Sequence, residues 1–334
     1  MNTQDKTNMF KGKTVLVTGG TGSIGSELVR QILKYEPAQV RIFSRNDTRQ
    51  YEFRENLGYP HNIRLMIGDI RDRDRLDFAF HGVDYVFHAA ALKHVPLCEY
   101  NQFETIKTNI VGSQNVIDMA IKNNVGKVVG ISTDKAAHPT SIMGVSKLMM
   151  EKLFVGAKLL TRDDPKFSCV RFGNVTWSDG SVLPLWNRQI KESGYIRVTN
   201  KNMTRFFMTI PQAARLVLKA AELTKGGEVF ILKMPSIKIA DLAKLFVKKY
   251  HPEKKIKMQF VGDRPGEKIH EHLVEHDGRD HHIFSNSEMI IVAPKYNSYD
   301  LSEFSYDYPD FKKIKNIKIT SQNSINHKKI AELI

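Results

Sequence analysis

Three consecutive residues, Thr133, Asp134 and Lys135, place a hydroxyl, a carboxyl group and an amine directly after a β-branched apolar run. Such a set can move protons if the pKa of Asp134 is raised enough to keep the acid protonated and the pKa of Lys135 is lowered by burial or by nearby positive charge. The alternative is a surface ion pair on a loop. Because ligands bind beyond the carboxyl ends of buried strands in open α/β sheets, we favour the catalytic interpretation.

A glycine-rich loop lies between a short apolar run, Thr14 to Thr18, and a segment with helical periodicity. Gly19 would allow the tight turn, Gly22 would let the backbone approach a pyrophosphate at the helix N-terminus, and Gly25 would permit close packing of helix on strand. This context predicts a dinucleotide-binding loop rather than a simple turn. The other residues that we assign to the loop's binding surface are Thr21, Ser23 and Ile24.

The end of the second predicted strand bears on the choice of cofactor. Ser44 and Arg45 stand about 20 residues after the last glycine, where NAD-selective sites place an acid. An arginine there favours a 2′-phosphate, so we predict NADP, with NAD less expected; the alternative for Arg45 is a surface ion pair. Asp69 and Ile70, after the third strand, are suited to the adenine edge, and the alternative for Asp69 is a helix N-cap.

The elements that must position these groups alternate between short apolar runs and helical segments, which predicts an α/β fold with a Rossmann-like, doubly wound parallel sheet and a smaller C-terminal substrate-binding lobe. We expect strands at 14–18, 40–43, 63–67, 85–88, 128–131 and 167–170, and later helices at 211–223 and 239–250. We expect a nucleotide-binding domain over 10–175 and a substrate lobe over 176–295, with some elements returning to the first domain. Residues 296–334 would form a loosely held tail of unassigned role.

Composition is that of an ordinary folded protein of 334 residues. The net charge of +14 is scattered, and no motif of a nucleic-acid-binding module appears, so we expect no nucleic-acid partner. No apolar run approaches the roughly 18 residues of a membrane span, and we expect a cytoplasmic protein with no membrane association. Two cysteines, Cys98 and Cys169, are too few for a disulfide framework.

Several motifs together carry a specific resemblance. They are the glycine loop, the segment from His88 to Pro96, the segment from Ser132 to Lys147, and Met203-Thr204-Arg205-Phe206-Phe207. In combination these motifs closely resemble UDP-N-acetylglucosamine 4,6-dehydratases of the extended short-chain dehydrogenase/reductase superfamily, which include capsule and flagellin-sugar enzymes. The resemblance covers roughly residues 12 to 290.

This resemblance implies a reaction in three steps. The C4 position of the sugar is oxidised, the C5 proton and the C6 hydroxyl are eliminated with Lys135 as base and Asp134 as acid, and hydride returns to C6. NADP would therefore be tightly bound and regenerated in each turnover. Thr133 would hydrogen-bond the C4 oxygen or the neighbouring acid. The product would be a UDP-4-keto-6-deoxy-hexosamine, and we expect C5 to be inverted, as in the capsule-related members that the chain resembles.

One position departs from the superfamily pattern. Lys147 lies four residues after Met143, the spacing of the usual Tyr-x-x-x-Lys pair, but the tyrosine is replaced. A thioether has no transferable proton, so Met143 cannot be the base for the C4 hydroxyl. Lys147 should still hold the nicotinamide ribose. Lys135, Asp134, Lys93 and His94 are the candidates for the missing base.

The resemblance also assigns binding residues. We expect further cofactor contacts from Ala89, Ala90, Ala91, Lys93 and Asn109. The substrate would be held by Lys93, His94, Asn174, Val182, Arg205, Arg264 and Glu267, with the arginines acting on the pyrophosphate or the uridine ribose.

Alternative functions stay open on the same scaffold: release of a 5,6-alkene sugar nucleotide, a nucleotide-sugar 4-epimerase, or a non-catalytic NADP-binding regulator. Related enzymes associate through helices beside the active site, so we expect a homo-oligomer. Five histidines between His270 and His282 invite a metal site, but their spacing matches no strong zinc pattern, and we predict no metal.

Overall fold

The computed structural model describes residues 8–161, 163–295 and 305–334. Its centre is a ten-stranded sheet in the order β16-β14-β15-β10-β6-β5-β4-β1-β2-β3. Seven neighbouring strands are parallel, and they are β3 (Ile63–Ile67), β2 (Gln39–Ser44), β1 (Thr14–Thr18), β4 (Tyr85–His88), β5 (Lys127–Ile131), β6 (Lys166–Arg171) and β10 (Glu228–Leu232). The predicted α/β fold with a parallel central sheet is confirmed.

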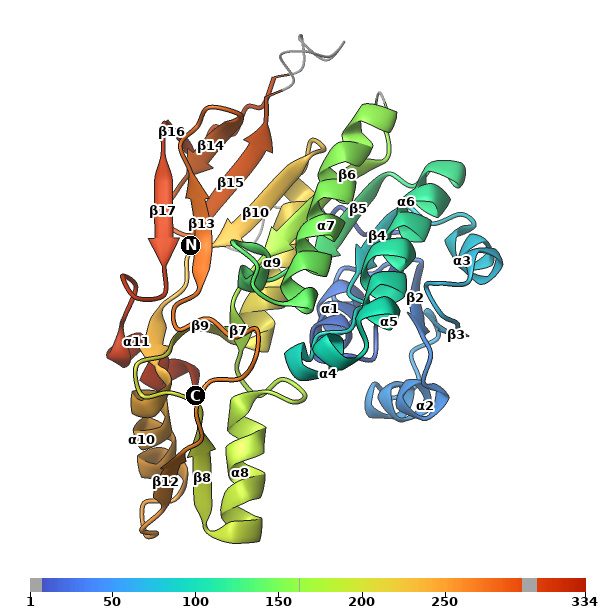
Figure 1. The fold of residues 1–334 in the computed structure, drawn as a ribbon. Helices are drawn as coiled ribbons and strands as arrows, with labels where there is room; N and C mark the ends of the chain where they lie inside the picture. Colours follow the sequence, from blue (N-terminus) through green and yellow to red (C-terminus); the bar gives the residue numbers. More distant parts are fainter. Residues whose placement is uncertain (1–7, 162, 296–304) are drawn as a thin grey trace.

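Helices cover both faces of this sheet (Figure 1). In that view α7 (Ile142–Gly156), α6 (Gly112–Lys122) and α3 (Arg73–Phe80) lie in front, and α1 (Ser23–Leu33) and α9 (Ile210–Leu223) lie behind. Helix α1 buries Leu28, Val29 and Ile32 on one stripe. The shorter helices are α2 (Asp47–Asn56), α4 (Val95–Tyr100), α5 (Gln102–Ile106), a π-helical turn at Lys107–Val111, and the 3-10 turns Asp134–Ala136 and Ala157–Leu160.

A second lobe has its own apolar core, built around Trp186 and Phe246. It contains α8 (Val182–Ser193), β8 (Tyr195–Val198), α10 (Ile239–Tyr250) and β12 (Lys257–Phe260), which pairs with β8. A small sheet is formed by β7 (Asn174–Val175), β9 (Thr204–Met208) and β11 (Ser236–Lys238). The last helix of the chain, α11 (His327–Leu333), also packs into this lobe through Ile330. Phe207 of β9 and Ile237 of β11 belong to the same apolar core, so this small sheet is fixed to the lobe.

The C-terminal part of the chain returns to the central sheet. Strands β14 (His281–Ser285) and β15 (Met289–Pro294) extend it in antiparallel fashion, and β13 (His272–His276) pairs with β17 (Ile317–Thr320). The expectation of a loosely held tail is wrong for residues 305–334. Strand β16 (Lys312–Ile314) pairs with β14, and buried Tyr308 donates a 2.7 Å hydrogen bond to Glu228. Residues 296–304 lie outside the described residues.

Within the described ranges, no helix has both the length and the apolar character needed to cross a membrane. Both cysteines are buried free thiols, and burial raises their pKa, as expected for packed rather than reactive side chains.

Candidate active site

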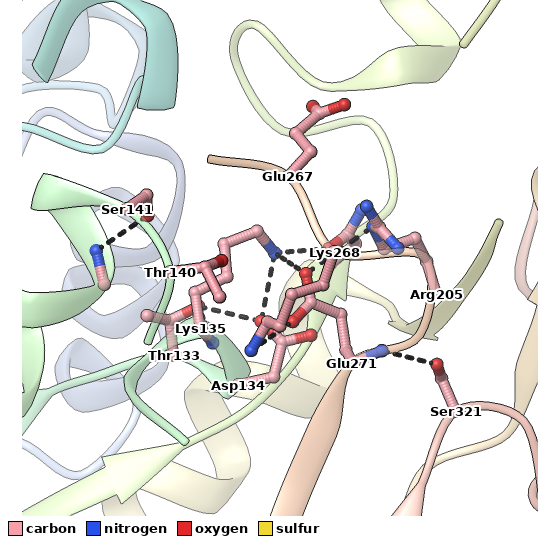
Figure 2. A network of polar contacts seen from close by, with 12 residues as sticks. Thr133, Asp134, Lys135, Thr140, Ser141, Arg205, Glu267, Lys268, Glu271 and Ser321 are labelled. Atoms are coloured by element: carbon pink, nitrogen blue, oxygen red, sulfur yellow. Dashed lines mark hydrogen bonds and ion pairs between the residues drawn. The ribbon is translucent and has the colours of Figure 1, made fainter. Parts of the chain in front are cut away.

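The Thr133-Asp134-Lys135 segment follows β5 at the carboxyl edge of the parallel sheet, where it forms a 3-10 turn. Thr133 begins this turn, and its hydroxyl donates a 3.0 Å hydrogen bond to Asp134 Oδ1. Lys135 Nζ donates to the same oxygen at 3.0 Å. Figure 2 shows these three side chains converging on one cluster of charges. The structure therefore brings together the acid and the amine that the sequence singled out.

Asp134 is fully buried, and burial raises its pKa. Its second carboxyl oxygen, Oδ2, is buried without a hydrogen-bond partner. A carboxyl group with one unpaired buried oxygen is more stable protonated than the same group in water, because the charged form loses its hydration. The expectation of a raised pKa at Asp134 is thus met.

The expectation for Lys135 differs from what the structure shows. Burial alone would lower the pKa of Lys135, but the carboxylates of Asp134 and Glu271 raise it. The Glu271 oxygen lies 3.6 Å from the amine, and Asn174 Oδ1 accepts a hydrogen bond from it at 3.3 Å. The two acids therefore outweigh burial and the positive charge of Arg205, and protonation of Asp134 would remove one of the two influences that raise the pKa of Lys135.

Glu271 is the residue that sequence reasoning missed. Its side chain is 1% exposed, and it lies within ion-pair distance of Lys135, of Lys268 at 2.9 Å and of Arg205 at 3.7 Å. Burial alone would raise the pKa of Glu271, but these three cations lower it. The signal was present in the sequence only as an acid following the Gly262–Lys268 motif, just before β13.

Lys268, also missed, connects the catalytic turn to the second lobe's loop. Its amine donates to the backbone carbonyl of Ala137 at 2.8 Å and forms an ion pair with Glu271. The same loop touches the start of α7, because Thr140 donates a 3.0 Å hydrogen bond to the carbonyl of Gly266. Hydrogen bonds thus join the loop at 262–268 to the segment that follows Lys135, although the two are distant in the sequence.

The predicted substrate residues divide into two groups. Arg205 on β9 and Asn174 on β7 join the cluster, but the Arg205 side chain is buried and also donates to the carbonyl of Thr204 at 2.8 Å. Arg264 remains outside: its guanidinium is half-exposed and lies 3.9 Å from Glu267. Val182 is the first residue of α8. Arg205 already forms an ion pair with Glu271, whereas Arg264 keeps a half-exposed guanidinium, and the substrate-binding roles of both stay predictions.

Helix α7 carries the methionine and lysine pair. Met143 is buried in a small apolar cluster with Val95, Cys98 and Leu92. Lys147, one turn later, is also buried, its amine lies 3.1 Å from the sulfur of Met150, and burial lowers its pKa to about 8. A buried ammonium with so few hydrogen-bond acceptors around it is expected where a bound ligand supplies further acceptors.

The segment after β4 is held by Asn109 rather than left free. Its side-chain amide exchanges two hydrogen bonds with the backbone of Leu92, at 2.8 and 2.9 Å, and donates a third to Ser146. Asn109 therefore positions this segment instead of presenting a free amide to a ligand. Lys93 donates to the carbonyl of Asp179 at 2.7 Å, and burial lowers the pKa of both Lys93 and His94.

The glycine loop has the geometry of a cradle for a diphosphate. Gly19 has a φ of +67°, and a Cβ there would come within 2.8 Å of the backbone of Ala89 and Ala90. A Cβ on Gly25 would overlap the carbonyl of Gly19. Backbone thus fills the space that side chains would need, and no side chain caps the N-terminus of α1.

At the end of β2 the side chains carry positive charge. Arg45 lies 3.6 Å from Asp69, and Arg71 binds the same carboxylate more closely. Burial alone would raise the pKa of Asp69, but the Arg71 hydrogen bonds and the charge of Arg45 lower it. Helix α3 is capped by Asp72, so the N-cap alternative for Asp69 is excluded. Ser44 accepts a hydrogen bond from Thr21 at 3.2 Å, which ties this edge to the glycine loop. These residues fit a dinucleotide.

Comparison with known proteins places the chain in a family. Residues 15–293 match the model of a family described as polysaccharide biosynthesis protein. The chain is 48% identical to an uncharacterized membrane protein of Methanocaldococcus jannaschii, over 87% of this chain and 89% of that protein. It is 43% identical to a UDP-glucose 4-epimerase of Rickettsia canadensis, over 80% and 79% of the two chains.

A second group of similarities concerns dehydratases and solved structures. The chain is 40% identical to an inverting UDP-N-acetylglucosamine 4,6-dehydratase of Campylobacter jejuni, over 89% of this chain and 88% of that one. The crystal structure of Pen from Bacillus thuringiensis matches with a TM-score of 0.89 at 41% identity, covering 97% and 98% of the two chains. The chain therefore belongs to the polysaccharide biosynthesis protein family that includes the UDP-N-acetylglucosamine 4,6-dehydratases.

Proposed function

We propose that this protein is an NADP-dependent 4,6-dehydratase of UDP-N-acetylglucosamine. A nucleotide-sugar dehydratase or epimerase is the coarser assignment that the relatives support. The observation that favours a dehydratase is the buried pair of Asp134 and Lys135. Elimination across C5 and C6 needs one acid and one base beside each other, whereas removal and return of hydride at C4 needs neither at those carbons.

NADP, held by the glycine loop, Arg45 and Lys147, would supply the hydride chemistry at C4 and C6 of the sugar. The protein's part is proton transfer and electrostatics. Once C4 is a ketone, Lys135 takes the C5 proton, and the carbonyl oxygen gains negative charge that the hydroxyl of Thr133 stabilises. Asp134 gives its proton to the departing C6 hydroxyl, which leaves as water. A proton then returns to C5, so the net change is loss of one water molecule.

The charges in the cluster suit this sequence of events. Lys135, Lys268 and Arg205 surround two acids, Asp134 and Glu271. When Asp134 is protonated and Lys135 is neutral, Lys268 and Arg205 face Glu271 as the one remaining carboxylate, and the net positive charge favours both an anionic diphosphate nearby and the developing enolate. Glu271 would position the Lys135 amine and keep the cations from repelling one another.

Two finer parts of the proposal rest on separate observations. Arg45 and Arg71 at the end of β2 and β3 favour the additional phosphate of NADP over NAD. Inversion at C5 is favoured by the Campylobacter jejuni relative, which is named as inverting. Because Met143 has no proton to transfer and lies in an apolar cluster, the C4 hydroxyl must lose its proton to another group. The candidates remain Asp134, Lys93, His94 and Lys135, and Lys135 could serve only if it releases that proton before it acts on C5.

The test is to incubate the protein with NADP and UDP-N-acetylglucosamine in deuterated water and to follow the sugar by NMR. We expect loss of water and deuterium at C5, and the ring couplings report the C5 configuration or a 5,6-alkene. An unchanged sugar with a folded, NADP-loaded protein would contradict the assignment for this substrate. Conversion at C4 alone, without loss of water, would instead identify an epimerase.

We also propose that the protein is a homo-oligomer. Helices α4, α5 and α7 expose large apolar side chains on neighbouring surfaces, and these are Leu97, Tyr100, Phe103, Val145 and Met149. Tyr100 is 90% exposed, which is costly for an aromatic side chain next to other apolar groups. A second copy meeting this face would bury it. Sedimentation should give a mass of at least two chains, and Tyr100→Glu with Phe103→Glu should give a monomer.

A further inference from the structure

A second cluster of side chains lies next to the catalytic turn but outside the proposed reaction. His138 follows Lys135 by three residues, and His272 and Glu275 come from β13. One potential ligand atom of each residue lies within 4.8 Å of the other two. His138 stands far earlier in the chain than the other two, so the spacing of the later histidines could not indicate this cluster.

An irregularity in β13 places two of these residues on one side. Side chains three apart on a regular strand point to opposite faces. The pairing of β13 with β17 shifts register between His272 and Val274, and such a bulge reverses the alternation. His272 and Glu275 therefore both face His138, whose own backbone has a φ of +47°, an uncommon value outside glycine.

The distances within the cluster suit a small metal ion with tetrahedral coordination. Glu275 Oε2 lies 3.4 Å from His138 Nε2 and 3.3 Å from His272 Nδ1. Bonds of about 2.0 to 2.1 Å in tetrahedral geometry separate neighbouring ligand atoms by about 3.3 to 3.4 Å. Two edges of a zinc coordination tetrahedron are thus already present.

The other contacts of His272 and Glu275 leave the potential ligand atoms available to an ion. His272 Nδ1 is buried and makes no hydrogen bond in the structure, which is costly for a polar atom. Lys318 binds the other oxygen of Glu275 at 2.7 Å, so it orients the carboxylate while Oε2 faces the two imidazoles. His138 and Glu275 also line a surface hollow, so an ion and a water molecule can reach them.

We propose that His138, His272 and Glu275 bind a transition-metal dication of the zinc type, with water completing the coordination. Two imidazoles and one carboxylate favour such an ion over Mg²⁺ or Ca²⁺, which prefer oxygen ligands. The ion would join the loop after Lys135 to the strand that begins next to Glu271. It would thereby fix the two sides of the acid-base cluster relative to each other without taking part in the reaction.

The test uses the full chain without a histidine tag, stripped with a chelator and titrated with Zn²⁺ by calorimetry. We expect one ion per chain, and a dissociation constant raised by more than about tenfold in each of His138→Ala, His272→Ala and Glu275→Gln. His276 and His281 are the matched control, because their rings lie 4.5 Å apart nearby but neither residue belongs to a group of three potential ligands among the described residues. His276→Ala and His281→Ala should leave the affinity unchanged.

Co²⁺ provides a readout that needs no variant. The wild-type protein loaded with Co²⁺ should show the intense visible absorption of a four-coordinate site, and hydrogen exchange of residues 133–139 should slow on loading. Absence of this absorption, or zinc binding that survives the three substitutions in folded variants, would overturn the proposal. Binding lost equally in the His276 or His281 variants would overturn it as well.

Discussion

The glycine loop and the acid-base cluster lie on the same edge of the sheet but are built on different physical principles. The loop uses backbone: Gly19 and Gly25 leave room that neighbouring main chain occupies, and the helix N-terminus offers N–H groups. The cluster uses buried charge: Asp134, Lys135 and Glu271 come from two distant segments and neutralise one another.

This difference predicts opposite sensitivities. A site made of closely packed backbone tolerates a change of nearby charge but not an added methyl group. A site made of buried charges tolerates an isosteric substitution in shape but not the loss of one charge, because its partners remain buried and unpaired. The substitutions below separate the two kinds of sensitivity, beginning with the largest expected effect.

Removing either member of the acid-base pair should have the largest effect on the reaction. Asp134→Asn and Lys135→Met keep side-chain size, and each should reduce turnover by about 100- to 10,000-fold because one proton transfer loses its donor or acceptor. Steady-state rates of water loss measure this. Lys122→Met, which breaks an exposed ion pair with Asp77, is the control and should retain full activity. Retained activity in both Asp134→Asn and Lys135→Met would contradict the assignment.

Loss of the Glu271 charge should destabilise the protein. Glu271→Gln leaves Lys135, Lys268 and Arg205 without their shared carboxylate, which we expect to cost about 3 kcal/mol in the free energy of unfolding. Chemical denaturation measures the cost. Glu222→Gln removes an exposed ion pair with Lys219 and should cost less than about 1 kcal/mol. Equal losses of unfolding free energy in the two variants would show that the buried cluster contributes no more to stability than an exposed ion pair.

The glycine loop should respond to size alone. Gly25→Ala places a methyl group against the Gly19 carbonyl, so we expect a loss of about 1 to 3 kcal/mol in stability together with weaker binding of NADP. Gly156→Ala is the matched control, because a Cβ there meets nothing within 4 Å at the end of α7. That substitution should stabilise the protein by about 0.5 to 1 kcal/mol. A harmless Gly25→Ala would refute the close-packing argument.

Lys147 should give a smaller, pH-dependent effect in the protein without cofactor. Its folded pKa of about 8 lies below the unfolded value of 10.5, so the unfolded chain binds the proton more tightly and stability rises with pH between these values. From pH 8 to 10 the wild type should gain about 2 kcal/mol more than Lys147→Met. Unfolding of both proteins at the two pH values measures the difference. If the stabilities of the two proteins changed with pH in parallel, burial would not destabilise the charged form of Lys147.

The sequence predicted those strands and helices that are determined by patterns of neighbouring residues. The runs at 14–18, 63–67 and 85–88 and the helix at 239–250 form the elements expected, because alternation of apolar and polar residues is a property of neighbours in the chain. The Thr133-Asp134-Lys135 segment was found for the same reason. Its position after β5 follows directly from the strand before it.

Features that depend on distant contacts could not be read in this way. Glu271 is one acid among 36 acidic residues until the fold places it beside Lys135. Glu271 adds to the effect of Asp134 in raising the pKa of Lys135, and it also forms the ion pair with Arg205. The polar composition after residue 295 suggested a loose tail, but two tyrosines, Tyr306 and Tyr308, bury their rings against the sheet edge.

The most direct test of the central claim follows a single hydrogen atom. UDP-N-acetylglucosamine carrying deuterium at C4 is converted by the NADP-loaded protein, and the product is examined by NMR and mass spectrometry. The account predicts deuterium on C6 of a sugar that has lost water, because the hydride taken from C4 returns to C6 after Asp134 and Lys135 have completed the elimination. Deuterium retained at C4 of a sugar that has kept its water would contradict it.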